Sequence, residues 1–179
     1  CGPGLFLRAM RRQHPGWQLH GVEPDARAAG LAQAAGLDVQ HCTLEAATLP
    51  AASWDAITLW NVIEHLPDPL AMLRRIGGLL RPGGKLYLAA PICDSWDAQL
   101  FGRYWTGWEL PRHFFAFDTR SLTQLLQAAG FQISASTCIN GRSYGFTASL
   151  RLLIQEQVRS FALRRLGEAL TYSRPLALA

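Results

Sequence analysis

Apolar residues recur along the first ninety positions in short blocks separated by polar turns. The block that begins at Leu5 repeats its apolar residues every three or four positions and stops before Pro15-Gly16, which predicts a helix over 5–13. The near-continuous apolar run Asp55–Trp60 predicts a strand buried on both faces. The same reasoning predicts helices over 24–35 and 68–80, and strands over 17–22, 37–41 and 85–90.

End signals support these elements. Pro24-Asp25 is typical of a helix start, and Gly36 of a left-handed cap that ends the helix. Asp68-Pro69 places an N-cap residue before proline at the first helical position. Arg81–Gly84 reads as a turn between helix and strand, and we assign it no chemistry.

The pattern changes after residue 90. The segment 92–117 is dense in aromatic residues and has no clear period. Beyond it, the sequence predicts a helix over 119–129 that Gly130 ends, a strand over 131–136, and a further strand over 144–150.

Strands that alternate with helices over short loops predict an α/β fold, a doubly wound, Rossmann-like, mostly parallel sheet with helices on both faces. We expect a domain over 1–148, with 92–117 as an insert that covers substrate, and a basic helical tail over 149–179. No strand precedes the turn at Cys1, so we expect the first central strand to be missing and the chain to be a poorly stable fragment.

Composition narrows the function classes. The 179 residues suffice for one buried core, and the net charge is +4. Residues 149–179 hold five arginines and two glutamates, so most of the positive charge lies in the tail and the domain has no nucleic-acid signature. The four cysteines are widely spaced without a CxxC pair, which predicts free thiols in a reducing cytoplasm and no metal site. No signal peptide or long apolar run favours secretion or membrane spanning.

A glycine turn opens the chain. Gly2 and Gly4 lead directly into a predicted helix, and Glu23 follows Gly4 by nineteen positions at the end of the next predicted strand. Glycines let the backbone approach a ligand, and a strand-end carboxylate accepts hydrogen bonds from ribose hydroxyls. This layout predicts a site for a nucleoside cofactor at the carboxyl ends of the strands, where other candidate residues also fall: Thr43, Leu44 and Asn61.

An ordered series of motifs strengthens this prediction. Cys1–Gly4 is followed by Glu23-Pro24, Thr43–Glu45 before Leu49-Pro50, Trp54-Asp55, Asn61–Pro69 and Leu80–Lys85. The series closely resembles the class I S-adenosylmethionine-dependent methyltransferases, in the branch that acts on small molecules and lipids. The resemblance covers about Cys1–Ser136.

The resemblance implies roles for the candidate residues. Gly2 and Gly4 would support the methionine part of S-adenosylmethionine, and Glu23 would bind its ribose. Pro24 and the backbone of Thr43 and Leu44 would flank the adenine, and Asn61 would lie near the methionine end. The family often has Asp where Thr43 stands, and its first motif has a further glycine and an acid before the position of Cys1.

Two histidines are candidate catalytic bases. His65 follows a predicted strand end, where it would contact the substrate or hold the loop through a backbone hydrogen bond; Glu64 we take as structural. His113 lies in the aromatic insert and would take a proton, and Arg112 beside it would bind an anionic group. The neighbouring aromatics are either a substrate cover or the core of a lid: Tyr104, Trp105 and Trp108.

The helical pattern of the tail places arginines on one face and apolar residues on the other. The apolar residues are Leu150, Leu153, Ile154, Val158 and Phe161. The alternatives are a helix packed on the domain, a partner interface, or a helix on a membrane surface that is recruited weakly.

The resulting hypothesis is methyl transfer from S-adenosylmethionine to a small-molecule, lipid or saccharide acceptor. One alternative is an NAD-dependent oxidoreductase, although Leu7 stands where the third glycine of GxGxxG belongs. The others are a non-catalytic binding module and a scaffold that acts through its tail. The acceptor, the atom methylated and the oligomeric state stay open.

Overall fold

The computed structural model describes the backbone of residues 1–137 and 144–171, and the side chains of 1–137 and 146–160. Cys138 lies outside these ranges; Cys1, Cys42 and Cys93 are free thiols. The elements in chain order are α1 (Leu5–Gln13), β1 (His20–Glu23), α2 (Ala26–Ala34), β2 (Asp38–His41), β3 (Trp54–Trp60), the 3-10 turn η1 (Ile63–His65), α3 (Pro69–Leu79), β4 (Leu80–Ala89), α4 (Trp96–Phe101), η2 (Gly102–Tyr104), η3 (Thr106–Trp108), α5 (Thr119–Ala128) and α6 (Tyr144–Thr171).

The chain forms two compact units. The first contains Cys1–Trp60 and Leu70–Leu88, and the second contains Asn61–Pro69 and the chain from Ala89 onward. The glycine turn and Glu23 therefore belong to the first unit, and both candidate catalytic histidines belong to the second.

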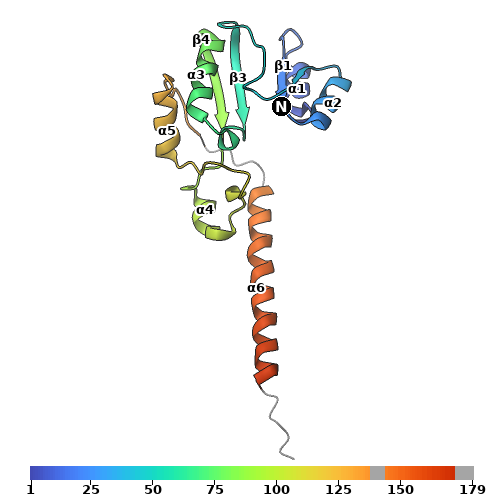
Figure 1. Ribbon diagram of the computed structural model, residues 1–179, viewed down its shortest axis with the longest axis vertical. Helices are drawn as coiled ribbons and strands as arrows, with labels where there is room; N and C mark the ends of the chain where they lie inside the picture. The colour runs from blue at the N-terminus through green and yellow to red at the C-terminus, as the bar shows by residue number, and fades with distance from the viewer. Residues whose placement is uncertain (138–143, 172–179) are drawn as a thin grey trace, which may run out of the picture. The chain divides into compact units, whose positions relative to one another are not determined.

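The strands pair in parallel, as expected. β1 and β2 are in register from His20 opposite Asp38 to Glu23 opposite His41. β3 and β4 pair in a second sheet, and their arrows run the same way in Figure 1. The Ser53 amide donates to the Leu79 carbonyl at the start of that pair, and the Asn61 amide to the Ala89 carbonyl at its end, which gives the same direction.

The core of the first unit explains the glycine at position 4. Leu7 of α1 packs with Ala29 and Ala32 of α2 and with Leu37 and Val39 near β2. Gly4 has φ 78°, and a Cβ built there would lie 2.2 Å from Leu37 Cδ1. The turn therefore needs glycine both for its left-handed backbone and for the close approach of α1 to this core.

The second unit is built around the aromatic insert. Ala98, Phe101 and Trp105 form its buried cluster, and Leu153 of α6 packs against them. Ser149 of α6 is fully buried, and its hydroxyl accepts a hydrogen bond from the Thr106 amide at 3.0 Å. α6 is thus part of this core along one side. Asp118 and Ser121 begin α5 with reciprocal capping hydrogen bonds.

Three expectations about the fold are wrong. Residues 131–137 form no strand, and Tyr144–Leu150 lies in α6 instead of a strand. β4 begins at Leu80 and so includes the predicted turn Arg81–Gly84. The apolar face expected on the tail is buried only in part: Leu153 packs inward, whereas Leu150, Ile154 and Val158 are exposed. Phe161 lies outside the described side chains. No helix in the described ranges has the length and apolar character of a membrane span.

Candidate functional site

The glycine turn and Glu23 come together in the first unit. The Gly2 amide donates to Glu23 Oε2 at 2.6 Å, and the amino group of Cys1 lies 2.8 Å from the same oxygen. Glu23 Oε1 accepts from the Asp25 amide at 3.0 Å. Gly2 and Gly4 both have positive φ, at 58° and 78°, which turns the backbone toward the carboxylate at the end of β1.

The surroundings of Glu23 favour its ionised form and leave one of its acceptor positions unused. Burial raises the pKa of Glu23, but the hydrogen bonds that its carboxylate accepts, among them those from the amides of Asp25 and Gly2, outweigh it, so the pKa lies below its ordinary value. A carboxylate offers about four acceptor positions. Three are used within the chain, which leaves one acceptor position of the carboxylate without a donor in the described residues.

The other predicted cofactor residues lie in turns after strands. Thr43 is exposed, and its carbonyl accepts from the amides of Ala46 and Ala47. Pro24 is exposed and Leu44 is half-buried. In the second unit, Asn61 has φ 51°, a left-handed conformation that asparagine tolerates better than most residues.

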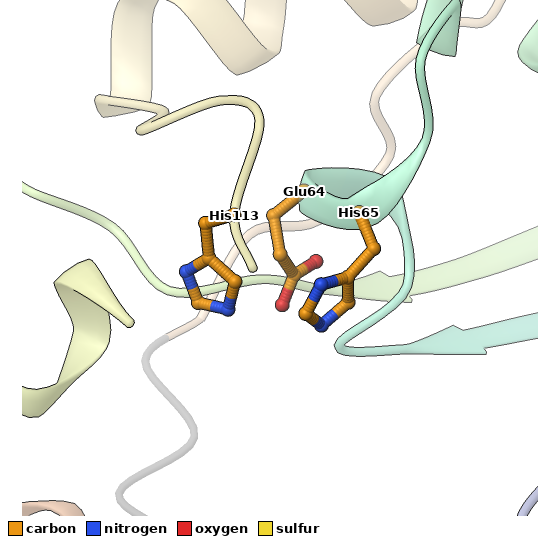
Figure 2. Close-up of side chains that lie close together, drawn as sticks. All are labelled: Glu64, His65 and His113. Carbon is orange, nitrogen blue, oxygen red and sulfur yellow. The ribbon is translucent and has the colours of Figure 1, made fainter. Parts of the chain in front are cut away.

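The two candidate histidines meet in the second unit, with Glu64 between them. Figure 2 shows the Glu64 carboxylate lying between the imidazole rings of His65 and His113. The ring centroids are 4.7 Å apart, and one ligand atom from each of the three residues lies within 4.8 Å of the others. η1 supplies the first two residues, and the loop after η3 supplies His113.

Backbone hydrogen bonds hold this cluster in place. His65 Nδ1 donates to the Arg112 carbonyl at 2.9 Å, and His113 Nδ1 donates to the Gly107 carbonyl at 2.9 Å. The Phe114 amide donates to the Glu64 carbonyl at 2.9 Å. Because carbonyl oxygens can only accept, both imidazoles carry a proton on Nδ1, which leaves each Nε2 facing other groups.

Glu109 adds a second carboxylate to the cluster. Its Oε2 lies 3.1 Å from His113 Nε2, and its Oε1 pairs with the exposed guanidinium of Arg112. Glu109 has φ 36°, an uncommon backbone conformation for this residue. Arg112 therefore pairs with Glu109 through its side chain and positions His65 through its carbonyl.

Glu64, which was expected to be only structural, lies at the centre of this cluster. It is 1% exposed, and neither of its carboxylate oxygens has a hydrogen-bond partner within the described residues. Burial raises the pKa of Glu64 and outweighs the opposing effects of its own backbone amide and of His65 and His113. The sequence signal for this cluster was a Glu-His pair soon after a predicted buried strand, with a further histidine downstream.

The aromatic candidates are held by packing and hydrogen bonds. Trp105 is 7% exposed and its indole donates to Asp97 Oδ2 at 3.0 Å. The Trp108 indole donates to the Gly102 carbonyl at 2.8 Å, and Tyr104 lies under the guanidinium of Arg103. Packing thus accounts for Trp105, while Tyr104 and Trp108 are half-buried at the border of the cluster.

Comparison with known proteins places these groups in context. A family model described as a methyltransferase domain matches residues 1–136. A ubiquinone biosynthesis O-methyltransferase from Xanthomonas oryzae pv. oryzae is 36% identical over 96 residues, which are 50% of this chain and 39% of the relative. The chain spans about two fifths of the length of the curated relatives it matches.

Solved structures give the same fold. A protein from Thermotoga maritima, titled an S-adenosylmethionine-dependent methyltransferase and possible histamine N-methyltransferase, matches with TM-score 0.62 and 25% identity over 74% of this chain and 60% of its own. An S-adenosylmethionine-dependent methyltransferase from Mesorhizobium loti matches with TM-score 0.59 and 20% identity over 85% of this chain and 80% of its own. The latter likeness concerns the fold alone.

Proposed function

The chain belongs to the class I S-adenosylmethionine-dependent methyltransferases, and from this premise we propose that it transfers a methyl group from S-adenosylmethionine to an oxygen of a small-molecule acceptor. The curated relatives are O-methyltransferases of ubiquinone biosynthesis. That name supports a hydroxyl as the methylated group and, among the small-molecule, lipid and saccharide acceptors considered, one of quinone type.

The observation that carries this proposal is the convergence of Gly2 and Glu23. The carboxylate already accepts from the turn and retains one acceptor position, which fits a ribose hydroxyl. A hydrogen bond to a charged acceptor contributes about 1.5–3 kcal/mol. Gly4 would support the methionine part, Pro24, Thr43 and Leu44 the adenine, and Asn61 the methionine end.

The bound cofactor supplies an electrophilic methyl group on a sulfonium. The residues of the chain must then bind the acceptor, orient it and accept its proton. His113 and His65 are the proposed proton acceptors, because each has Nδ1 committed to a backbone carbonyl, which leaves Nε2 as the basic atom. His113 would first have to release the contact between its Nε2 and Glu109. A base in position contributes about 10²–10⁴-fold to the rate of transfer from a hydroxyl.

Acceptor binding is assigned to the residues around this cluster. Arg112 would contact an anionic group of the acceptor by exchanging its ion pair with Glu109. Tyr104 and Trp108 would cover apolar parts, and we keep Trp105 as a residue that supports them from the core. A second contact is proposed for α6, whose exposed apolar residues and arginines fit weak binding to an anionic membrane surface.

Two measurements test the function. Calorimetric titration of the full chain with S-adenosylhomocysteine should show one site, and titration with NAD should show none. Mass spectrometry of small-molecule extracts incubated with protein and methyl-labelled cofactor should then reveal a labelled ether. Binding without any labelled product would favour the non-catalytic module, and binding of NAD alone would overturn the proposal.

A further inference from the structure

The starting point is a carboxylate that is buried without a partner. Glu64 is 1% exposed, and both of its side-chain oxygens lack a hydrogen bond within the described part of the chain. A buried ionised group is costly unless it is paired or coordinates a metal. Glu64 sits on a short turn whose carbonyl accepts from the amides of Phe114 and Phe115, so the chain holds it in this place.

The two histidines beside Glu64 have the protonation pattern of metal ligands. Each donates Nδ1–H to a backbone carbonyl, that of Arg112 for His65 and that of Gly107 for His113. In metal sites the ligating imidazole typically donates its other N–H to such an acceptor, which fixes its tautomer and orientation. The Nε2 atoms are therefore the ones that could bind a metal, that of His113 after it gives up its contact with Glu109.

We propose that Glu64, His65 and His113 bind a first-row divalent transition-metal cation. One potential ligand atom from each residue lies within 4.8 Å of the others, so small side-chain movements would bring all three onto one ion. Figure 2 shows the three side chains converging from η1 and the loop after η3. The cysteine spacing considered above concerns thiolate sites and does not bear on this one.

The donor set favours a particular class of cation. Two imidazoles and one carboxylate suit Zn²⁺, Fe²⁺ or Mn²⁺ better than Mg²⁺ or Ca²⁺, which prefer oxygen ligands. Glu109 is the other charged group at the site: its Oε2 contacts His113 Nε2, and its Oε1 pairs with Arg112. On binding, the cation would replace the His113–Glu109 contact and leave Glu109 with Arg112 or as a further ligand.

The proposed metal binding does not require the proposed methyl transfer to be correct. If both are correct, the metal would change the role of the two histidines in the transfer. With both Nε2 atoms on a cation, neither ring could act as a base. The cation would instead bind the acceptor hydroxyl and lower its pKa.

The test measures binding in the absence of cofactor, so its result does not depend on methyl transfer. The full chain, without an affinity tag and stripped with EDTA, is titrated with Zn²⁺, Mn²⁺ and Mg²⁺ by calorimetry and thermal melting. At cation concentrations about 100-fold above the dissociation constant, Zn²⁺ or Mn²⁺ should raise Tm by about 5–10 °C, and Mg²⁺ should act more weakly. Co²⁺ should give a visible absorption band from nitrogen coordination.

Variants separate a metal site from a structural cluster. Glu64→Gln should raise Tm in EDTA, because it removes the cost of burying a carboxyl group whose oxygens have no partner in the described residues, and should abolish the stabilisation by metal. His65→Gln and His113→Gln should each weaken binding by at least about 100-fold, as removal of a direct ligand exceeds typical outer-sphere effects. Glu45→Gln and His14→Gln, at exposed positions in the first unit, serve as matched controls.

Two outcomes would overturn the proposal. One is the absence of any calorimetric, thermal or Co²⁺ absorption signal with the stripped wild-type chain. The other is metal binding that persists unchanged in Glu64→Gln and His113→Gln, since the ion would then bind elsewhere.

Discussion

Replacing Glu23 by glutamine tests the cofactor site most directly. The substitution keeps the shape of the side chain but removes its charge and turns one acceptor into an amide donor. The wild-type carboxylate accepts from Gly2 and Asp25 and pairs with the Cys1 amino group. In the variant, one of these donors would face the new NH₂ group and lose its partner.

Two effects follow, with separate magnitudes. An unpaired donor costs about 1–3 kcal/mol of folding free energy, which for a chain of this size lowers Tm by about 2–12 °C. Loss of a charge-assisted bond to ribose costs a further 1.5–3 kcal/mol of binding energy, roughly a 10–150-fold weaker affinity.

The assay is calorimetric titration with S-adenosylhomocysteine at a temperature well below both melting transitions, with Glu45→Gln as the control. Glu45 is exposed on the loop after β2, and its backbone carbonyl accepts a hydrogen bond from Arg75. Wild-type affinity in a folded Glu23→Gln protein would refute the assignment of Glu23 to the ribose.

Three further predictions concern stability and the surface. Gly4→Ala should destabilise the fold by at least about 2 kcal/mol in chemical denaturation, because it places alanine in a left-handed backbone conformation and creates a clash with Leu37. Gly2→Ala should lose less stability, because its Cβ would meet open space and only the backbone cost applies. Equal losses in the two variants would contradict this reasoning. Burial raises the pKa of Asp97, but hydrogen bonds from Ser95 and Trp105 outweigh it and hold the pKa below its ordinary value. Because the pKa of Asp97 is lower in the folded protein, the carboxylate stabilises the fold above the unfolded pKa, and this stabilisation is lost as pH falls through the folded pKa. The free energy of unfolding of Asp97→Asn should therefore fall less steeply than that of the wild type below about pH 4. Parallel plots of unfolding free energy against pH for the two proteins would argue against this role of Asp97. Replacing both Arg151 and Arg159 by glutamine should reduce co-sedimentation with anionic vesicles by roughly 30-fold, at about 1 kcal/mol per charge, whereas neutral vesicles should bind neither protein.

Local signals were sufficient for much of the first unit. Asp25 was predicted to start a helix, and its carboxylate accepts from the Ala28 amide at 2.7 Å as an N-cap. Gly36, predicted as a left-handed cap, has φ 71°. The bond between Glu23 and the glycine turn could also be expected, because both follow from strand-end positions in one parallel fold.

The second unit depends on contacts that no local pattern contains. The alternation over 131–136 suggested a strand, but a strand needs a hydrogen-bonded partner, and Ile133 is left 42% exposed. The link between His65 and Arg112 joins positions 47 residues apart, across a segment of aromatic residues without a period. The same long-range pairing buries Glu64, which explains why its surroundings could not be foreseen from its neighbours in the sequence.

The two-sided character of α6 bears on how this protein should be dissected. Ser149 and Leu153 close the interior beneath the tryptophans, while Leu150, Ile154 and Val158 look outward. A protein truncated at residue 148 would lose residues that belong to the hydrophobic core of the second unit. Loss of activity in that protein would therefore reflect unfolding and would not test binding to a membrane surface. Substitutions confined to the exposed residues leave this core intact, so they separate the structural role of α6 from a role in surface binding.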